Sequence, residues 1–219
     1  MGFYAMPAHV SDPAEAIGAV CAAARSRDRA SSEWWIAPDT EPADVEKQLV
    51  NRGAVVSDVA DILAYDMSHG VPEIPVPGKV EDVVVGNAQH LDDAETVAAA
   101  VWGGTPSSGE RREAQLQSLG HPLDGQGGFR VVAYIEGDPF ATAGCQIVDP
   151  VARLYGGCVL PESRGRGGYR STLRKRLEVA HDHGARLALV HARTNTSKPI
   201  LTRLGFKSYG EARLYTLPV

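Results

Sequence analysis

The sequence predicts an α+β fold in which a meander of strands leads into a strand, a glycine-rich loop and a helix. Two apolar runs, 129–135 and 140–148, flank a Glu-Gly-Asp turn, which is a strong β-hairpin pattern. Residues 155–160 then form an apolar strand that passes through an arginine- and glycine-rich loop, 164–168, into a helix over about 169–183. Such a junction is typical of anion sites, because glycines admit the backbone to the anion and first-turn N–H groups point at it.

The bulk composition limits the function classes. A 219-residue chain with 43% hydrophobic and 22% charged residues has the composition of an ordinary globular protein. Its net charge of -5 argues against nucleic-acid partners. The three cysteines, Cys21, Cys145 and Cys158, are odd in number and widely spaced, which predicts neither a metal site nor a disulfide framework. No apolar run reaches roughly 18 residues and the start lacks a signal-peptide pattern, so we expect a cytoplasmic protein without a membrane partner.

The first part of the chain, residues 1–67, reads as helix, strand, helix, strand. Asp12 and Pro13 are a cap and a first helical residue, and a second helix over 41–52 stops at Gly53. The remaining segments are a short strand at 34–37 and a strand pair or one bent strand at 55–67. Residues 68–79 carry three prolines and two glycines without periodicity, which indicates a linker.

The rest of the chain, residues 80–219, adds a longer series of elements. Before the hairpin we expect a strand at 83–85 and helices at 91–101 and 110–119. After the central helix we expect a strand at 186–192, a short helix at 197–204 and one or two strands over 208–217. The predicted order is therefore strand, two helices, a three-strand meander, helix, strand, helix and strand.

The loop can be tested against known phosphate-binding patterns. A Walker loop is absent, and the dinucleotide pattern G-x-G-x-x-G begins at Gly165 but fails at Arg170. Arg164 to Gly167 matches R-x-x-G, preceded by V-x-P at 159–161. This resembles the acetyl-CoA-binding motif [QR]-x-x-G-x-[GA] of the GNAT superfamily of N-acetyltransferases, with Tyr169 departing from the final Gly or Ala. The alternative is a solvated loop whose glycines only turn the chain.

The resemblance covers residues 80–219 and implies the GNAT fold, a mixed and mostly antiparallel sheet flanked by helices. It implies acetyl-CoA as acyl donor and no metal. Residues 1–67 resemble a half-repeat of that fold without a cofactor motif, since LVNRG at 49–53 occupies the place that LTRLG has at 201–205. The alternative for this part is an unrelated small cap.

The resemblance also implies a cofactor site. The pantetheine would lie along 155–160, where Gly156 and Gly157 are a plausible bulge. The pyrophosphate would bind the loop N–H groups, with Arg166 and Arg170 beside it, while Arg174 to Arg176 would be a solvated helix face. The implied cofactor-binding residues are Val159, Leu160, Arg164, Gly165, Arg166, Gly167, Gly168, Tyr169 and Arg170.

The catalytic groups are less clear, because Leu201 stands where many GNAT enzymes carry a tyrosine that protonates the thiolate. Cys158 and His191 are candidate bases; the alternatives are a core cysteine, a structural histidine and a base made of water. Acceptor specificity would come from 103–128 and the last strands, where Asp124, Glu110 and His121 are possible contacts to a cationic amine.

We therefore expect an acetyl-CoA-dependent N-acetyltransferase that acts on a small-molecule or protein amine, as a monomer or homodimer. The alternative is a CoA-binding sensor or scaffold that performs no transfer, which Leu201 favours. A nucleotide-dependent oxidoreductase ranks third, because its fingerprint fails at Arg170.

Overall fold

The computed structural model describes residues 12–119, 123, 126–148 and 150–219. By their contacts these residues form two compact units. The first unit contains residues up to Ile62 together with Ala192–Pro199 and Ser208–Val219, and the second unit contains Leu63–His191 and Ile200–Lys207. This grouping follows contacts rather than chain order, and the division of the chain at 68–79 stays a prediction.

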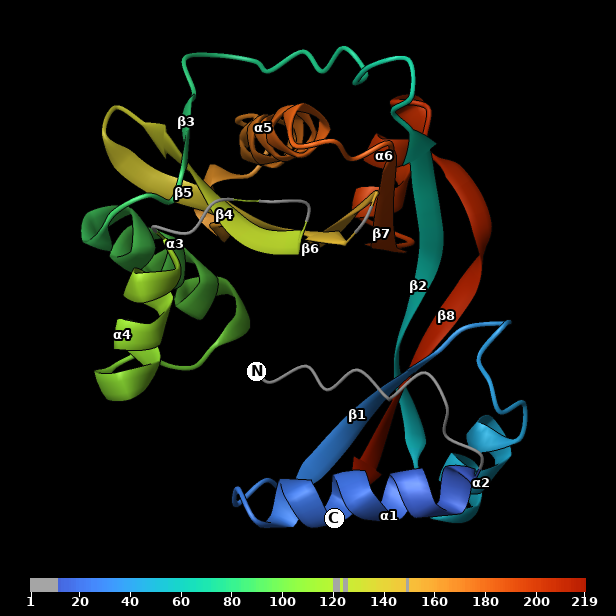
Figure 1. The fold of residues 1–219 in the computed structure, drawn as a ribbon. Coiled ribbons are helices and arrows are strands. Elements are labelled where there is room, and N and C mark those ends of the chain that lie inside the picture. Colours follow the sequence, from blue (N-terminus) through green and yellow to red (C-terminus); the bar gives the residue numbers. More distant parts are fainter. Residues whose placement is uncertain (1–11, 120–122, 124–125, 149) are drawn as a thin grey trace. The chain divides into compact units, whose positions relative to one another are not determined.

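The strands form one hydrogen-bonded, mixed sheet with the order β1-β8-β2-β7-β6-β5-β4-β3. The strands β3 to β6 pair antiparallel, and β6 pairs parallel with β7 after the crossover helix α5 (Figure 1). The expected mixed, mostly antiparallel α+β fold is confirmed. The elements are α1 (Pro13–Arg25), β1 (Ser31–Ile36), α2 (Val45–Asn51), β2 (Val55–Asp66), β3 (Glu81–Val84), α3 (Ala88–Trp102), α4 (Gly109–Ser118), β4 (Gln126–Ile135), β5 (Asp138–Val148), β6 (Val151–Val159), the 3-10 turn Pro161–Ser163, α5 (Gly168–Asp182), β7 (Leu187–Arg193), α6 (Ser197–Arg203) and β8 (Lys207–Pro218).

In the second unit, α5 and α3 cover opposite faces of the sheet (Figure 1). Each helix is amphipathic and places an apolar stripe on the strands. The stripe of α5 includes Leu173, Leu177 and Ala180, and that of α3 includes Leu91 and Val97, all of them almost fully buried. The sheet therefore has two distinct faces, which we call the α5 face and the α3 face.

Several boundaries differ from the sequence-based expectation. The helix α3 begins at Ala88 rather than 91, because Asn87 caps it and its side chain accepts a 2.8 Å hydrogen bond from the His90 N–H. The strand β6 begins at Val151, four residues before the predicted start at 155. The strands β2 and β8 are each continuous, which agrees with one of the two alternatives expected for each segment.

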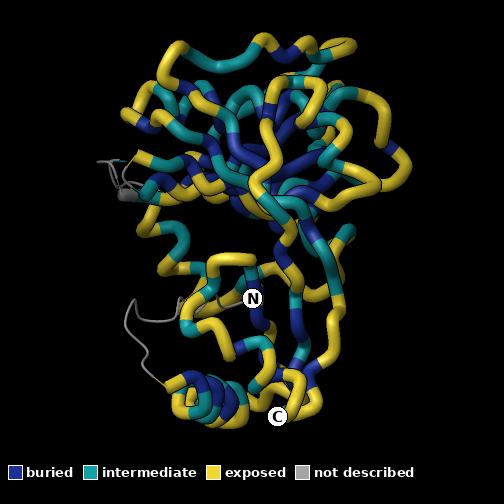
Figure 2. Tube along the Cα trace, turned by 90° about the vertical axis from the view of Figure 1, so that its right-hand side faces the viewer, coloured by how far each residue is buried: buried dark blue, intermediate teal, exposed yellow. Residues whose placement is uncertain are grey.

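The first unit confirms the order helix, strand, helix, strand. Asp12 caps α1 as predicted, accepting a 2.8 Å hydrogen bond from the Ala14 N–H. A separate apolar core contains Ile17, Leu49, Trp34 and Tyr215, the last contributed by β8, which pairs with β1. Figure 2 shows a buried interior within each unit. That this part is a half-repeat stays a prediction.

The segment 68–79 has no helix or strand, as predicted, and it packs closely within the second unit, to which it belongs. Ile74 is buried, and the Pro75 carbonyl accepts a 3.4 Å hydrogen bond from Arg170 of α5. The segment therefore lies along the start of α5 rather than acting as a loose tether (Figure 1). Among the helices that the structure describes, none is both long and apolar enough to span a membrane.

Candidate active site

The loop between β6 and α5 presents backbone N–H groups at a helix start. Gly165 and Gly167 have positive φ angles of 79° and 93°, a backbone conformation that favours glycine. The first bond of the α-helical type runs from the Ser171 N–H to the Gly167 carbonyl at 2.9 Å. The N–H groups of the preceding residues, Gly168 to Arg170, therefore have no acceptor inside α5 and lie at the positive end of its dipole.

Packing requires two of the loop glycines independently of any ligand. A Cβ atom at Gly167 would lie 2.9 Å from Cδ of Pro77, and one at Gly168 would lie 2.6 Å from the Phe140 ring. Both distances are below normal van der Waals contact. The glycines therefore allow α5 to begin directly against β5 and against the segment 68–79.

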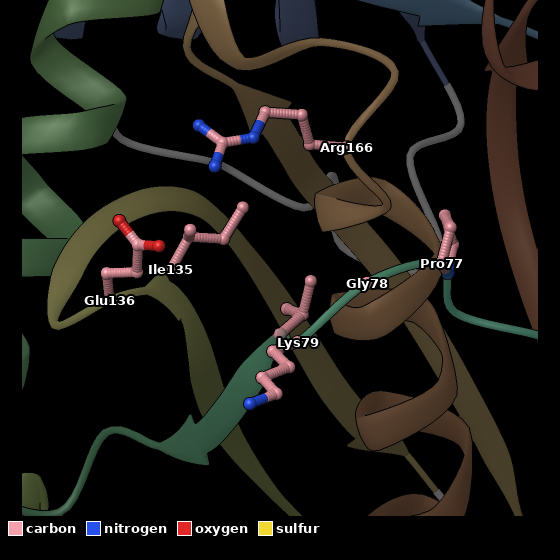
Figure 3. A pocket seen from close by; sticks show the side chains of 7 residues that line it. Pro77, Gly78, Lys79, Ile135, Glu136 and Arg166 are labelled. Atoms are coloured by element: carbon pink, nitrogen blue, oxygen red, sulfur yellow. The ribbon is translucent and has the colours of Figure 1, made fainter.

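Arg166 extends from this loop into a cavity of about 440 Å³ (Figure 3). Lys79 comes from the segment that precedes β3, and Glu136 comes from the turn between β4 and β5. The two cations and one carboxylate give the cavity a formal charge of +1. The lining residues are Pro77, Gly78, Lys79, Val80, Ile135, Glu136 and Arg166.

Tyr169, which departs from the family motif, lies away from the loop backbone. A Cβ atom at Gly157 of β6 would be 3.4 Å from the Tyr169 ring, so the ring packs on the strand. The Tyr169 side chain therefore leaves the loop N–H groups open, and its backbone N–H remains in the first turn of α5.

The predicted bulge in β6 is present. Tyr155 pairs with Gly144 and Cys158 pairs with Thr142, so β6 has one more residue than β5 between these two pairs. Gly156 has a φ of 58°. The register of β6 with β7 ends at the pair Leu154–Val190, before the bulge. The two strands thus lose their pairing where the family would place the pantetheine.

One backbone donor in this region is oriented toward β7. The Leu160 N–H donates a 2.9 Å hydrogen bond to the Phe140 carbonyl of β5. Because successive N–H groups of a strand point to opposite sides, the Val159 N–H points toward the β7 side. Val159 is therefore placed to donate to a group lying beside β6.

The expectation of a solvated face at Arg174 to Arg176 is wrong for Arg176, whose residue is 2% exposed. Its guanidinium donates hydrogen bonds to the carbonyls of Thr172 at 3.1 Å and Gly144 at 3.1 Å, with Tyr155 at 3.5 Å. Burial lowers the pKa of Arg176. This cation lies behind the bulge on the α5 face, and its hydrogen bonds tie α5 to β5 and β6.

The two basic residues that precede Arg176 form ion pairs with a carboxylate. Arg174 and Lys175 lie 2.8 and 3.3 Å from the carboxylate of Asp82, whose side chain is only 5% exposed. Ser171 donates a further hydrogen bond to the same carboxylate. Asp82 therefore fastens β3 to the first half of α5, the helix that carries the loop.

The two candidate bases lie in different environments. Cys158 is 6% exposed, and burial raises the pKa of its thiol, which keeps it protonated at neutral pH. His191 is exposed on β7, and partial desolvation lowers the pKa of its imidazole from 6.5, so the ring is neutral at pH 7. Leu201, at the position of the family's tyrosine, is fully buried. Nearby in the sequence, the ring of Phe206 lies 5.3 Å from the Tyr65 ring of β2.

The α3 face carries polar residues that the sequence did not single out. Arg130 of β4 lies 3.7 Å from Glu95 of α3, and Glu95 accepts hydrogen bonds from the Ser107 N–H at 2.6 Å and hydroxyl at 2.9 Å. The exposed aromatic residues Trp102 and Tyr155 lie on the same unit. The sequence signal for this cluster was Arg130 itself, a charged residue within the apolar run 129–135.

The other expected acceptor contacts are only partly visible. Glu110 is exposed in the first turn of α4, while His121 and Asp124 lie outside the described residues. Within the described ranges, no group of three or more His, Cys, Asp or Glu side chains is arranged to hold a metal ion.

Comparison with known proteins identifies the family of this arrangement. Residues 94–206 match the model of the Acetyltransferase (GNAT) family. This match spans α3 through α6 and includes the loop, the bulge and both candidate bases. Among curated proteins, none matches the sequence.

Solved structures share the fold over nearly the whole chain. A GCN5-related N-acetyltransferase from Kribbella flavida is 23% identical, with a TM-score of 0.64 over 95% of this chain and 77% of that one. A GCN5-related N-acetyltransferase from Sphaerobacter thermophilus is 18% identical, with a TM-score of 0.63 over 92% and 65%. A tandem GNAT protein from the clavulanic acid biosynthesis pathway is 17% identical, with a TM-score of 0.57 over 93% and 69%. At these identities the likeness shows the fold alone.

Proposed function

Because the chain belongs to the GNAT acetyltransferase family, we propose that it is an N-acetyltransferase that uses acetyl-CoA and acetylates an amine by direct attack on the thioester. One observation carries the proposal. An open helix start follows directly on a bulged strand that has lost its pairing with β7, so an anion site and a site for an extended arm are continuous along the chain.

In this proposal the cofactor-binding residues are Val159, Leu160 and Arg164 to Arg170. The loop N–H groups and Arg166 hold the pyrophosphate at the start of α5. Bound acetyl-CoA supplies the acyl group. The Val159 N–H, oriented away from β5, donates to the carbonyl oxygen of that group and stabilises the charge that develops there.

We assign the base to His191 rather than to Cys158. A base must be unprotonated at working pH, and the lowered pKa of His191 meets this condition, whereas the raised pKa of Cys158 does not. His191 also lies on β7, the strand that faces the unpaired part of β6.

The proposed acceptor is a small-molecule or protein amine. The buried, free cysteines suit a cytoplasmic location.

The proposal is tested by thiol release from acetyl-CoA across a panel of amines, with calorimetric titration of CoA. Acetyl-CoA at about 100 times its dissociation constant should stabilise the protein by roughly 2.7 kcal/mol, and NAD or ATP at the same concentration should not. Thermal unfolding followed by fluorescence measures this shift. An equal shift with NAD would contradict the proposed cofactor.

The second candidate is a CoA-binding sensor or scaffold. The observation that favours it is Leu201, which is fully buried at the position of the family's tyrosine and provides no acid. Tight CoA binding without turnover of any amine would establish this candidate in place of the enzyme.

His191→Gln is expected to lower kcat by about 100-fold, the smaller end of the range for loss of a general base. In the unsubstituted protein kcat should fall as pH drops through the pKa of His191, which lies below 6.5, because protonation removes the base. The variant should lack this acidic limb. The matched control is His183→Gln, at the exposed end of α5. A variant that keeps both kcat and the acidic limb would remove His191 from catalysis.

A further inference from the structure

We propose that Arg130 binds a carboxylate of the acceptor, so that the substrate class is an amine that also carries a carboxylate, such as an amino acid. This inference rests on the proposed acetyl transfer and names its acceptor. It is carried by the position of Arg130 beside the bulge and by a guanidinium nitrogen that has no hydrogen-bond partner.

The strand register places Arg130 on the same face as the bulge residues. Arg130 pairs with Gly144 of β5, which pairs with Tyr155 of β6, and directly paired residues point to the same face. Cys158 is on this face through its pair with Thr142. Since Val132, which is two residues from Arg130 on β4, packs with Leu91 of α3, this is the α3 face.

Glycine at 144 brings Arg130 and Tyr155 close together. A side chain at Gly144 has no room, because the Tyr155 ring occupies that space. The positive charge of Arg130 lowers the pKa values of both Tyr155 and Cys158, although burial outweighs it and raises them. Arg130 is thus close to the exposed ring of Tyr155, beside the bulge.

One guanidinium nitrogen of Arg130 has no hydrogen bond within the described part of the protein, although Arg130 forms an ion pair with Glu95. This nitrogen, Nη1, is buried and has no hydrogen-bond partner there. The nearest carboxylate oxygen, Oε1 of Glu95, is 3.7 Å away, beyond hydrogen-bonding distance. A buried donor without a partner is costly and rare in native structures, so a polar group that binds this guanidinium would be stabilising.

Glu95 forms an ion pair with Arg130 but lies too far from Nη1 to accept a hydrogen bond, and Ser107 holds its carboxylate in place. Ser107 donates to Oε2 from its N–H at 2.6 Å, and its single hydroxyl hydrogen is within reach of both carboxylate oxygens, with Oγ 2.9 Å from Oε1 and 2.8 Å from Oε2. Burial raises the pKa of Glu95, but these hydrogen bonds, with Gln115 and Arg130, outweigh it and lower the pKa. Glu95 is therefore ionised and holds the loop after α3, while Arg130 faces the site.

The chemistry of the remaining donor selects a carboxylate. The planar fork of a guanidinium matches two carboxylate oxygens and forms hydrogen bonds stronger than those between neutral groups. The Arg130 side chain is 32% exposed although its Nη1 is buried, so a ligand approaches the guanidinium from the exposed part of the side chain. Trp102 and Tyr155, at 50% and 41% exposure, offer apolar surface to the rest of such an acceptor.

The test compares matched substrate pairs, each an amino acid and its amide, for the unsubstituted protein and for Arg130→Gln. We expect Arg130→Gln to lower kcat/KM at least tenfold for the acids and less than threefold for the amides. The pKa of each amine is the same whichever protein acts on it. The fold-change in kcat/KM for the acid divided by that for the amide therefore isolates the contact between Arg130 and the carboxylate. Arg130→Lys, which keeps the charge, should recover part of the loss.

The controls separate this inference from the proposed function. Arg29 is an exposed residue of the first unit, and Arg29→Gln should leave kcat/KM unchanged for both the acids and the amides. CoA binding should be unchanged in Arg130→Gln. If amines are acetylated but Arg130→Gln lowers kcat/KM equally for acid and amide, the role of Arg130 is overturned while the proposed acetyltransferase function stands. If no amine is acetylated, calorimetry of N-acetyl amino acids and their amides with the CoA-bound protein decides: equal affinities overturn the inference.

Discussion

Arg166→Glu is expected to weaken CoA binding by at least 100-fold. The substitution removes a guanidinium from the loop that begins α5 and places a carboxylate near the proposed pyrophosphate. Like charges about 4 Å apart repel by roughly 4 kcal/mol at an intermediate effective dielectric, and solvent screening at this exposed side chain reduces that value. Loss of the attractive contact between the guanidinium and the phosphates adds to this repulsion. A 100-fold loss of CoA affinity corresponds to about 2.7 kcal/mol. Calorimetric titration of CoA measures the effect.

Arg166 is a sharper test of the loop than its glycines. A side chain at Gly167 would collide with Pro77, so a substitution there would disturb the packing as well as the proposed anion site. Arg166 is exposed and its replacement should leave the fold intact. The control is Arg29→Glu, which makes the same charge change at an exposed position of the first unit. CoA affinity within threefold in folded Arg166→Glu protein would exclude this loop residue from the phosphate site.

Arg176→Ala is expected to destabilise the second unit by about 3 kcal/mol. The change leaves the buried carbonyl of Gly144 and the partly buried carbonyl of Tyr155 without this donor, at about 1–3 kcal/mol for a buried unsatisfied group, and opens a cavity behind the bulge. Relief of the cost of burying a cation offsets part of this loss. Since about 1 kcal/mol lowers Tm by roughly 2–4 °C in a protein of this size, Tm should fall by about 6–12 °C.

The matched control lies on the same helix. Glu178 has a side chain that is 42% exposed and pairs with Arg174 at the surface, so Glu178→Ala should change stability by less than about 1 kcal/mol. Differential scanning fluorimetry compares the two variants. If Arg176→Ala melts within 2 °C of the unsubstituted protein, the hydrogen bonds to the bulge do not contribute to stability.

Local pattern was sufficient for most elements of the fold. The hairpin turn, the period of α5 and the capping residue Asp12 each depend on neighbouring residues in the chain, and the structure has all three. The bulge was predictable for the same reason, because the adjacent Gly156 and Gly157 weaken a strand. Starts of elements were less certain: the cap at Asn87 lies before the apolar run of α3, and β6 begins before its glycines.

The position of Arg176 was also within reach of the sequence. Leu173, Leu177 and Ala180 form the apolar face of α5, and residue 176 lies on that face by helical spacing. Treating the run Arg174 to Arg176 as one charged group obscured this period. That its guanidinium meets the carbonyls of Gly144 and Tyr155 follows only from the pairing of β5 with β6.

The sequence by itself determined the fold class, the position of the glycine- and arginine-rich loop and the family, because these depend on short-range patterns of glycine, arginine and apolar residues. The tertiary structure alone decided which distant groups share a face. Arg130 meets Tyr155 through two strand registers, and Pro77 meets Gly167 through the path of the segment 68–79. Such contacts depend on strand order and register, and no local propensity specifies which strands become neighbours or how they are aligned.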